Sequence, residues 1–204
     1  DRIEHLTAAS SATGRLTKIK ASIDDQGTIH ALDYDQIDDV GAYPRAPEPA
    51  SLYRMHGNLS GAYKVKNIRC RNRVILTNKT PSGLNRGFGG PQHYFALERL
   101  VHQIAVELKL NVLDVIKINL LEKNQFPYKS PSGALLDSGN FQKLVKKVIE
   151  SSTYKKILKN KNDSVKNGKI YGIGYSAIIE PSISNMGYVT TALPHQDREK
   201  TGHK

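Results

Sequence analysis

The chain of 204 residues has one cysteine, no tryptophan and no long apolar run. Because Cys70 stands alone, a disulfide within the chain and a site built from several thiolates are excluded, which fits a reducing compartment such as the cytoplasm. Apolar runs such as residues 177–179 are far shorter than the roughly 20 residues that a membrane-spanning helix needs. We therefore expect a cytoplasmic location, no membrane span, and Cys70 as a small buried or half-buried side chain.

Acidic side chains are also scarce, since 19 Asp and Glu stand against 30 Lys and Arg and give a formal charge of +11. Hydrophobic residues make up 38% of the sequence and charged residues 24%, which supplies a core and excludes wholesale disorder. The length suits one large or two small globular domains.

The basic excess is local, because residues 123–169 hold 11 Lys against three acidic side chains. A basic stretch can bind nucleic acid or an acidic partner. Nucleic acid is disfavoured here because the cations are nearly all Lys and few aromatic side chains stand between them for stacking. A solvated face is the simpler interpretation, and a non-catalytic basic binding or subunit-docking module that uses the Lys-rich face 143–169 remains the alternative.

The first part of the chain carries strand patterns. Apolar and polar residues alternate over residues 16–23 and 28–34, and the turn sequence 24–27 between them predicts a β-hairpin. Residues 66–77 resume as a strand. Four carboxylates at Asp33, Asp35, Asp38 and Asp39 lack the Gly and Glu of a calcium-binding loop, so we interpret them as a solvated strand edge.

Helical spacing follows. Apolar residues recur every three or four positions from Pro91 to Leu110, and Asn111 is the expected N-cap of a short helix over residues 112–120. An amphipathic helix begins near Phe141. The pattern then predicts a loop over 161–168, a strand over 170–179 and its partner over 188–193.

A glycine-rich stretch ends directly at the first of these helices. Gly87, Gly89 and Gly90 let the backbone approach a ligand closely, and Pro91 suits the first helical turn. The free amides of Gln92 and His93, the positive helix end and the Arg86 guanidinium predict a seat for a phosphate or another oxyanion. Phe88 is expected to point outward and wall a pocket. A tight structural turn is the alternative, since neither a Walker motif nor G-x-G-x-x-G is present.

The string Arg86-Gly-Phe-Gly-Gly-Pro-Gln92, preceded by Thr77-Asn78, resembles the large molybdenum-binding chain of the molybdenum hydroxylases, the xanthine dehydrogenase and aldehyde oxidase family. Further segments fall in family order along nearly the whole chain, namely residues 1–6, 62–63, 67–68, 115–120, 137–139 and 180–181. The resemblance implies an internal fragment of a longer subunit with an α+β fold, in which strand hairpins and packed helices belong to two molybdopterin-binding domains. Residues 1–122 would form the end of the first domain, residues 123–136 the linker between the domains, and residues 137–204 the start of the second domain.

The resemblance also implies an activity. Family members hydroxylate aldehydes or N-heterocycles with oxygen from water. The cofactor is molybdopterin with molybdenum, here expected in the cytosine dinucleotide form, and electrons pass to iron–sulfur clusters and FAD on partner subunits or domains. The expected partners are therefore the remaining segments of the large subunit, an iron–sulfur subunit, an FAD subunit and a small-molecule substrate.

By the same resemblance, Phe88 is the aromatic wall on which substrates stack, a geometry that favours planar molecules. Arg54 falls where purine-oxidising relatives orient substrate, although a surface arginine is the alternative. The positions that match the family's cofactor-binding motif are Arg86, Gly87, Phe88, Gly89, Gly90 and Gln92.

The family's catalytic glutamate lies in a later segment and another glycine-rich cofactor loop in an earlier one, so we expect no catalytic residue within this chain and no turnover by it alone. Glu180 is better interpreted as part of a turn, because Pro181 follows it. Gly87 stands where the carbon monoxide-oxidising branch carries a copper-bearing cysteine, which disfavours that substrate. His93 and His102 are nine residues apart on one helix and would not converge on a metal.

Overall fold

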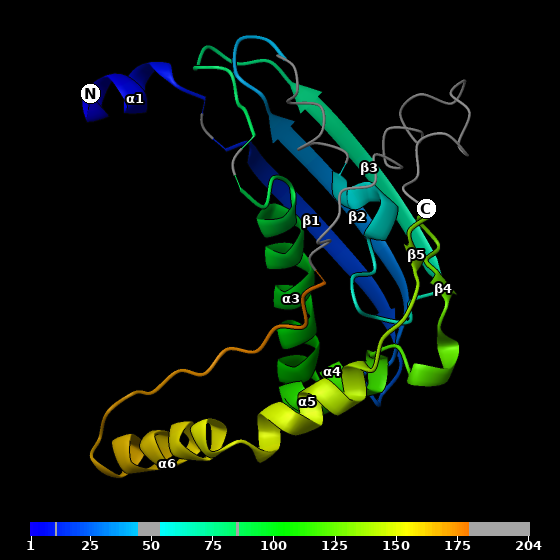
Figure 1. Ribbon diagram of the computed structural model, residues 1–204. Coiled ribbons are helices and arrows are strands. Elements are labelled where there is room, and N and C mark those ends of the chain that lie inside the picture. The colour runs from blue at the N-terminus through cyan, green and yellow to red at the C-terminus, as the bar shows by residue number, and fades with distance from the viewer. Residues whose placement is uncertain (11, 45–53, 85, 180–204) are drawn as a thin grey trace.

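The computed structural model describes residues 1–10, 12–44, 54–84 and 86–179, and it has an α+β fold (Figure 1). Three strands form one sheet in the order β1-β2-β3, with β1 at Gly14–Ile23, β2 at Ile29–Asp39 and β3 at Asn67–Ile75. Helix α3, Gly90–Glu107, lies against β1 on one face of this sheet. The mixed fold that the sequence predicts is therefore confirmed.

The remaining elements follow in chain order around this centre. A short helix α1 precedes the sheet at Arg2–Ala8, and the 3-10 turn η1 occupies Arg54–Asn58. After α3 come α4 at Val112–Asn119, the 3-10 turn η2 at Lys123–Gln125, and a two-stranded hairpin. Its strands are β4 at Tyr128–Lys129 and β5 at Leu135–Leu136. Two helices follow, α5 at Phe141–Glu150 and α6 at Ser152–Lys166.

The predicted hairpin is confirmed. Strands β1 and β2 pair antiparallel with Ile19 opposite Tyr34, and the turn closes through a hydrogen bond from the Gly27 amide to the Asp24 carbonyl over 3.0 Å. Gly27 has φ +85°, a conformation that glycine adopts without strain. The local alternation and turn chemistry therefore specify this part of the fold.

The interpretation of the acidic stretch as a solvated edge is wrong, because β2 is the central strand. Strand β3 pairs parallel to its second side, and this long-range pairing has no local sequence signal. Asp33 and Asp35 form ion pairs with Arg69 and Arg73 of β3. Asp39 pairs with Lys79, which follows β3, and Asp38 is fully buried. Among the described residues, no group of three or more His, Cys, Asp or Glu side chains could hold a metal ion.

The core lies between the inner face of the sheet and the helices. Leu97 and Val101 of α3 are completely buried, together with Tyr34 of β2. The spacing of the buried positions on α3 is three and four residues, as the sequence predicts. Helix α4 also begins as expected, because the Asn111 side chain accepts a hydrogen bond from the Leu113 amide over 2.8 Å.

Asn119 ties α4 to the hairpin turn. Its side-chain oxygen accepts the Ile29 amide over 2.8 Å, and its amide group donates to the carbonyls of Gly27 and Val115, each over 2.8 Å. The side chain is 1% exposed, so all three bonds are shielded from water. This contact fixes the far end of the hairpin on the helical layer.

The second part of the chain differs from its prediction in two places. Helix α6 continues to Lys166, so the predicted loop over 161–168 is wrong, because the helix extends through most of these polar residues. Residues 170–179 form an extended segment with alternating exposure but pair with no strand among the described residues. The predicted partner at 188–193, like Glu180, lies outside the described residues. The division at residues 123–136 stays a prediction.

Cys70 is exposed, contrary to expectation, because β3 is an edge strand whose inner face is only partly covered. In the described part of the chain, no helix is both long and apolar enough to cross a membrane.

Candidate functional site

The glycine-rich stretch forms a tight turn that runs directly into α3. Gly87 and Gly89 have φ values of +85° and +83°, in the left-handed region. The Gly90 amide donates to the Gly87 carbonyl over 2.7 Å, and the His93 amide donates to the Gly89 carbonyl over 3.2 Å. A Cβ added at Gly87 would lie 3.3 Å from two ring carbons of Pro91. The sharp turn therefore needs glycine.

The end of α3 at this turn is electropositive. The free amide expected at His93 is wrong, because this N–H donates to the Gly89 carbonyl over 3.2 Å. The helix dipole still adds partial positive charge at this end. The first turn of α3 holds no acidic side chain, and Arg86 is exposed beside it. The arrangement can hold an anionic group against the backbone of the loop.

The structure places the predicted site residues as follows. Arg86 is exposed, Phe88 and Gln92 are half-buried, and the backbone of Gly89 and Gly90 is buried. These residues share one loop by chain continuity. Arg54 begins η1, which lies near α3, but its side chain is outside the described part of the structure. The contacts that the family resemblance implies for these residues stay predictions.

Gln92 anchors the loop to the strand layer. Its Nε2 donates to the Thr13 carbonyl over 3.1 Å, just before the start of β1. Its Oε1 is buried and has no hydrogen-bond partner among the described residues. An unpaired acceptor at this position can receive an N–H or O–H group from a ligand.

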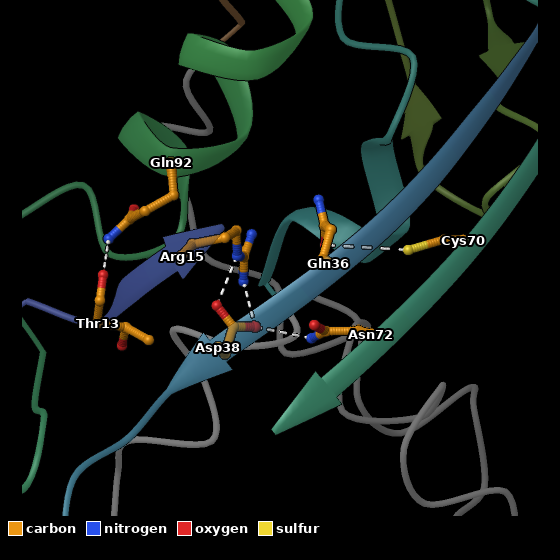
Figure 2. A network of polar contacts seen from close by, with 7 residues as sticks. All are labelled: Thr13, Arg15, Gln36, Asp38, Cys70, Asn72 and Gln92. Atoms are coloured by element: carbon orange, nitrogen blue, oxygen red, sulfur yellow. Dashed lines mark hydrogen bonds and ion pairs between the residues drawn. The ribbon is translucent and has the colours of Figure 1, made fainter. Parts of the chain in front are cut away.

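A buried polar network lies below the loop and was missed by the sequence analysis (Figure 2). Arg15 Nε and Nη2 donate to the two carboxylate oxygens of Asp38 over 2.6 and 2.9 Å, and Asn72 Nδ2 donates to Asp38 Oδ2 over 2.8 Å. Asp38 falls on the inward-facing positions of β2, after Tyr34 and Gln36. That inward position of a charge is the one signal that could have revealed it.

His93 lies immediately behind the loop and is completely buried. Its ring centroid is 5.7 Å from that of Tyr34 and 5.1 Å from that of Tyr94. Neither ring nitrogen has a hydrogen-bond partner among the described residues. Burial lowers the pKa of His93 to about 3, with a further contribution from the positive charge of Arg15, so the ring is neutral at ordinary pH.

Glu98, two turns further along α3, was also missed. The Tyr63 hydroxyl lies 2.9 and 3.0 Å from its two carboxylate oxygens, and the Ala177 amide donates to Oε2 over 2.9 Å. Burial raises the pKa of Glu98 to about 7, against the opposing effect of these hydrogen bonds. Its protonation state therefore changes near neutral pH.

The family model of the molybdopterin cofactor-binding domain matches residues 1–120. The large subunit of nicotine 6-hydroxylase from Paenarthrobacter nicotinovorans is 26% identical over 190 residues, which cover 92% of this chain and 23% of the relative. Aldehyde oxidase 1 from Bos taurus is 30% identical over 141 residues, which cover 68% of this chain and 10% of the relative.

Solved structures agree with these matches. Quinoline 2-oxidoreductase from Pseudomonas putida 86 is similar with a TM-score of 0.73 and 25% identity, over 82% of this chain and 22% of that one. The reconstituted CO dehydrogenase from Oligotropha carboxidovorans gives a TM-score of 0.71 and 25% identity, over 83% of this chain and 22% of that one. The chain thus spans less than a quarter of the length of each of these relatives.

Proposed function

Since the chain belongs to the family of molybdopterin cofactor-binding domains, we propose that it forms part of the cofactor and substrate pocket of an oxidoreductase that hydroxylates aldehydes or N-heterocycles with water oxygen. The observation that carries this proposal is the glycine turn at residues 86–90, which opens the electropositive end of α3. Relatives named as hydroxylases, oxidases and dehydrogenases support the oxidoreductase class.

The residues present fit a molybdopterin group. Molybdopterin carries a phosphate and several N–H donors, and the loop offers the complementary groups. The left-handed Gly87 and Gly89 shape a tight turn in which Gly87 stays half-exposed, the helix end favours the anion, and the buried Gln92 Oε1 is an acceptor that no described residue satisfies. Arg86 adds a positive charge at the exposed side of the turn.

The proposed roles follow from these positions. Arg86, the backbone of Gly87–Gly90 and Gln92 hold the cofactor, and the half-buried Phe88 ring is the wall on which a planar substrate stacks. Arg54 orients the substrate. When bound, the cofactor supplies the molybdenum that accepts two electrons. We assign no proton-transfer step to residues of this chain, and the chain alone does not turn over substrate.

The finer features belong to the same proposal. The cofactor is the cytosine dinucleotide form, and iron–sulfur clusters and FAD on partner subunits or domains carry the electrons away. The chain acts together with the remaining segments of the large subunit, in the cytoplasm. Residues 1–122 end a first cofactor domain, and residues 137–204 start a second.

Loss of Arg86 tests the proposal in the intact subunit that carries this segment. Arg86→Ala should lower the molybdenum and molybdopterin content per chain, while Phe88→Ala should keep the cofactor and raise KM for aromatic heterocycles. Arg99→Ala is the matched control, because Arg99 is exposed on the same helix and away from the loop. Equal cofactor contents in the Arg86 and Arg99 variants would contradict the proposal.

A basic docking module is the second candidate function, favoured by one observation. Helix α6 extends away from the sheet in Figure 1, and the lysines of the last two helices are exposed. These are Lys143, Lys146, Lys147, Lys155, Lys156, Lys159, Lys161 and Lys166. A steep fall of partner affinity with salt would support this function, whereas loss of Arg86 would leave that affinity unchanged.

A further inference from the structure

We propose that Arg15 and Asp38 form a positioning pair, which holds the cofactor loop in register over the end of the sheet through Thr13 and Gln92. This inference rests on the proposed function, because it concerns the placement of the same loop. Neither residue is assigned a contact with the cofactor. Their role is to orient the groups that make such contacts.

The Arg15–Asp38 pair has a fixed geometry. Arg15 and Asp38 have side chains that are 2% and 0% exposed, and they meet through two parallel hydrogen bonds of 2.6 and 2.9 Å. A bidentate guanidinium–carboxylate contact fixes both distance and orientation. A buried ion pair adds little stability over an apolar pair of similar size, because both charges lose their hydration. Its distinctive contribution is therefore geometric.

The pair joins all three strands near one end of the sheet. Arg15 is near the start of β1 and stands directly opposite Asp38 near the end of β2. Asn72 of β3 donates to the same carboxylate over 2.8 Å. One carboxylate thus sets the relative position of three strand ends (Figure 2).

Thr13 and Gln92 connect the end of β1 to the loop. Thr13 lies two residues before Arg15, and its carbonyl accepts the Gln92 amide group over 3.1 Å. Gln92 lies two residues after Gly90, where the turn enters α3. Fixing β1 through Arg15 therefore fixes the Thr13 carbonyl. The Thr13 carbonyl in turn directs the unpaired Gln92 Oε1.

A double replacement separates positioning from stability. Arg15→Met with Asp38→Leu removes both buried charges and keeps apolar volume, so the subunit should still fold, with an unfolding temperature lowered only by the loss of the Asn72 hydrogen bond to Asp38. The loaded intact subunit should nevertheless release molybdopterin about 10- to 100-fold faster, by analogy with the loss of affinity at metal sites whose ligands lose their supporting hydrogen bonds. Release is followed by the fluorescence of the freed, oxidised pterin.

The matched control is an ion pair on the opposite face of the same sheet. Arg73→Met with Asp35→Leu makes the same chemical change between β3 and β2, where the side chains are 50% and 37% exposed. This control should release molybdopterin at the wild-type rate. Arg15→Lys keeps the buried positive charge but loses the bidentate geometry of the guanidinium. This variant should fold and should release molybdopterin at an intermediate rate.

The outcomes distinguish the two proposals. Wild-type subunit that retains no molybdopterin would refute the proposed function. Wild-type retention with equal retention in a stable Arg15/Asp38 double variant would overturn the positioning pair and leave the proposed function standing. If the double variant fails to fold, the Arg15→Lys variant decides: faster release supports the pair, and wild-type release overturns it.

Discussion

The Glu98 carboxylate accepts the backbone amide of Ala177 over 2.9 Å, although 79 positions separate the two residues. It is the middle one of three contacts between α3 side chains and the backbone of residues 175–179. In the other two, Tyr94 donates to the Ile179 carbonyl and His102 Nε2 lies 2.7 Å from the Tyr175 carbonyl. Four helical residues rise about 6 Å and two extended residues about 6.6 Å, so the two spacings match. Side chains of α3 take the place of a neighbouring strand.

Replacing Glu98 should change how stability depends on pH. Its pKa rises from 4.5 to about 7 on folding, so its contribution is fully present below pH 4.5 and is lost as pH rises to about 7. Glu98→Gln should remove this loss, up to roughly 3 kcal/mol, and flatten that part of the pH profile. Urea unfolding at several pH values measures the effect. A variant profile that falls as steeply as the wild-type one would refute this role for Glu98.

His93 should act in the opposite direction on acidification. Its pKa falls from 6.5 to about 3 on folding, so its contribution is present above pH 6.5 and is lost as pH drops toward 3. His93→Phe keeps a ring beside Tyr34 and Tyr94 and removes two unpaired buried nitrogens. We expect about 1 kcal/mol more stability at pH 7 and a larger gain at pH 4.

Thermal unfolding of the 204-residue chain checks the His93 prediction. His5→Phe is the control, because His5 is exposed on α1. A His93→Phe variant that is less stable than wild type at both pH values would show that an unseen partner satisfies the ring nitrogens.

Alanine at Gly87 should destabilise the cofactor loop. A side chain at φ +85° costs about 1–2 kcal/mol, and the new Cβ would lie 3.3 Å from the Pro91 ring. Gly172→Ala is the control, since nothing lies within 4 Å of a Cβ there. The unfolding temperature and the molybdopterin content should both fall for Gly87→Ala and stay unchanged for the control. Equal behaviour of the two variants would show that the turn tolerates a side chain.

Loss of the Asn119 side chain should weaken the contact between the hairpin turn and α4. Asn119→Ala leaves the Ile29 amide and the Gly27 carbonyl without their buried partner, at a cost of about 2–4 kcal/mol. Asn124→Ala is the control, because Asn124 is exposed in η2. Urea unfolding measures both variants, and a loss below 0.5 kcal/mol for Asn119→Ala would contradict this account.

The sequence predicted the elements whose signals are local. Alternation, helical spacing and capping are signals that involve residues within about four positions of one another. They predicted the hairpin at residues 16–34, the helix from Pro91 and the Asn111 cap, and each is present. The glycine turn could likewise be found from the sequence, because glycines favour a tight turn and a following Pro favours the start of a helix.

Features that depend on distant partners could not be predicted in this way. The central position of β2 requires its pairing with β3, whose partner residues lie 36 positions later. The extended segment up to Ile179 alternates like a strand, yet its partners are side chains of α3. The Arg15–Asp38 pair has no signal beyond an inward-facing charge, because its meaning depends on the strand register.

Hydrogen exchange in the intact subunit, with and without molybdopterin, tests the central claim most directly. If residues 86–92 hold the cofactor, the amides from the glycine turn through His93 should exchange more slowly in the loaded subunit. Those of exposed α6 should not change. Equal exchange of the glycine turn in the loaded and empty subunits would contradict the claim that this loop holds the cofactor.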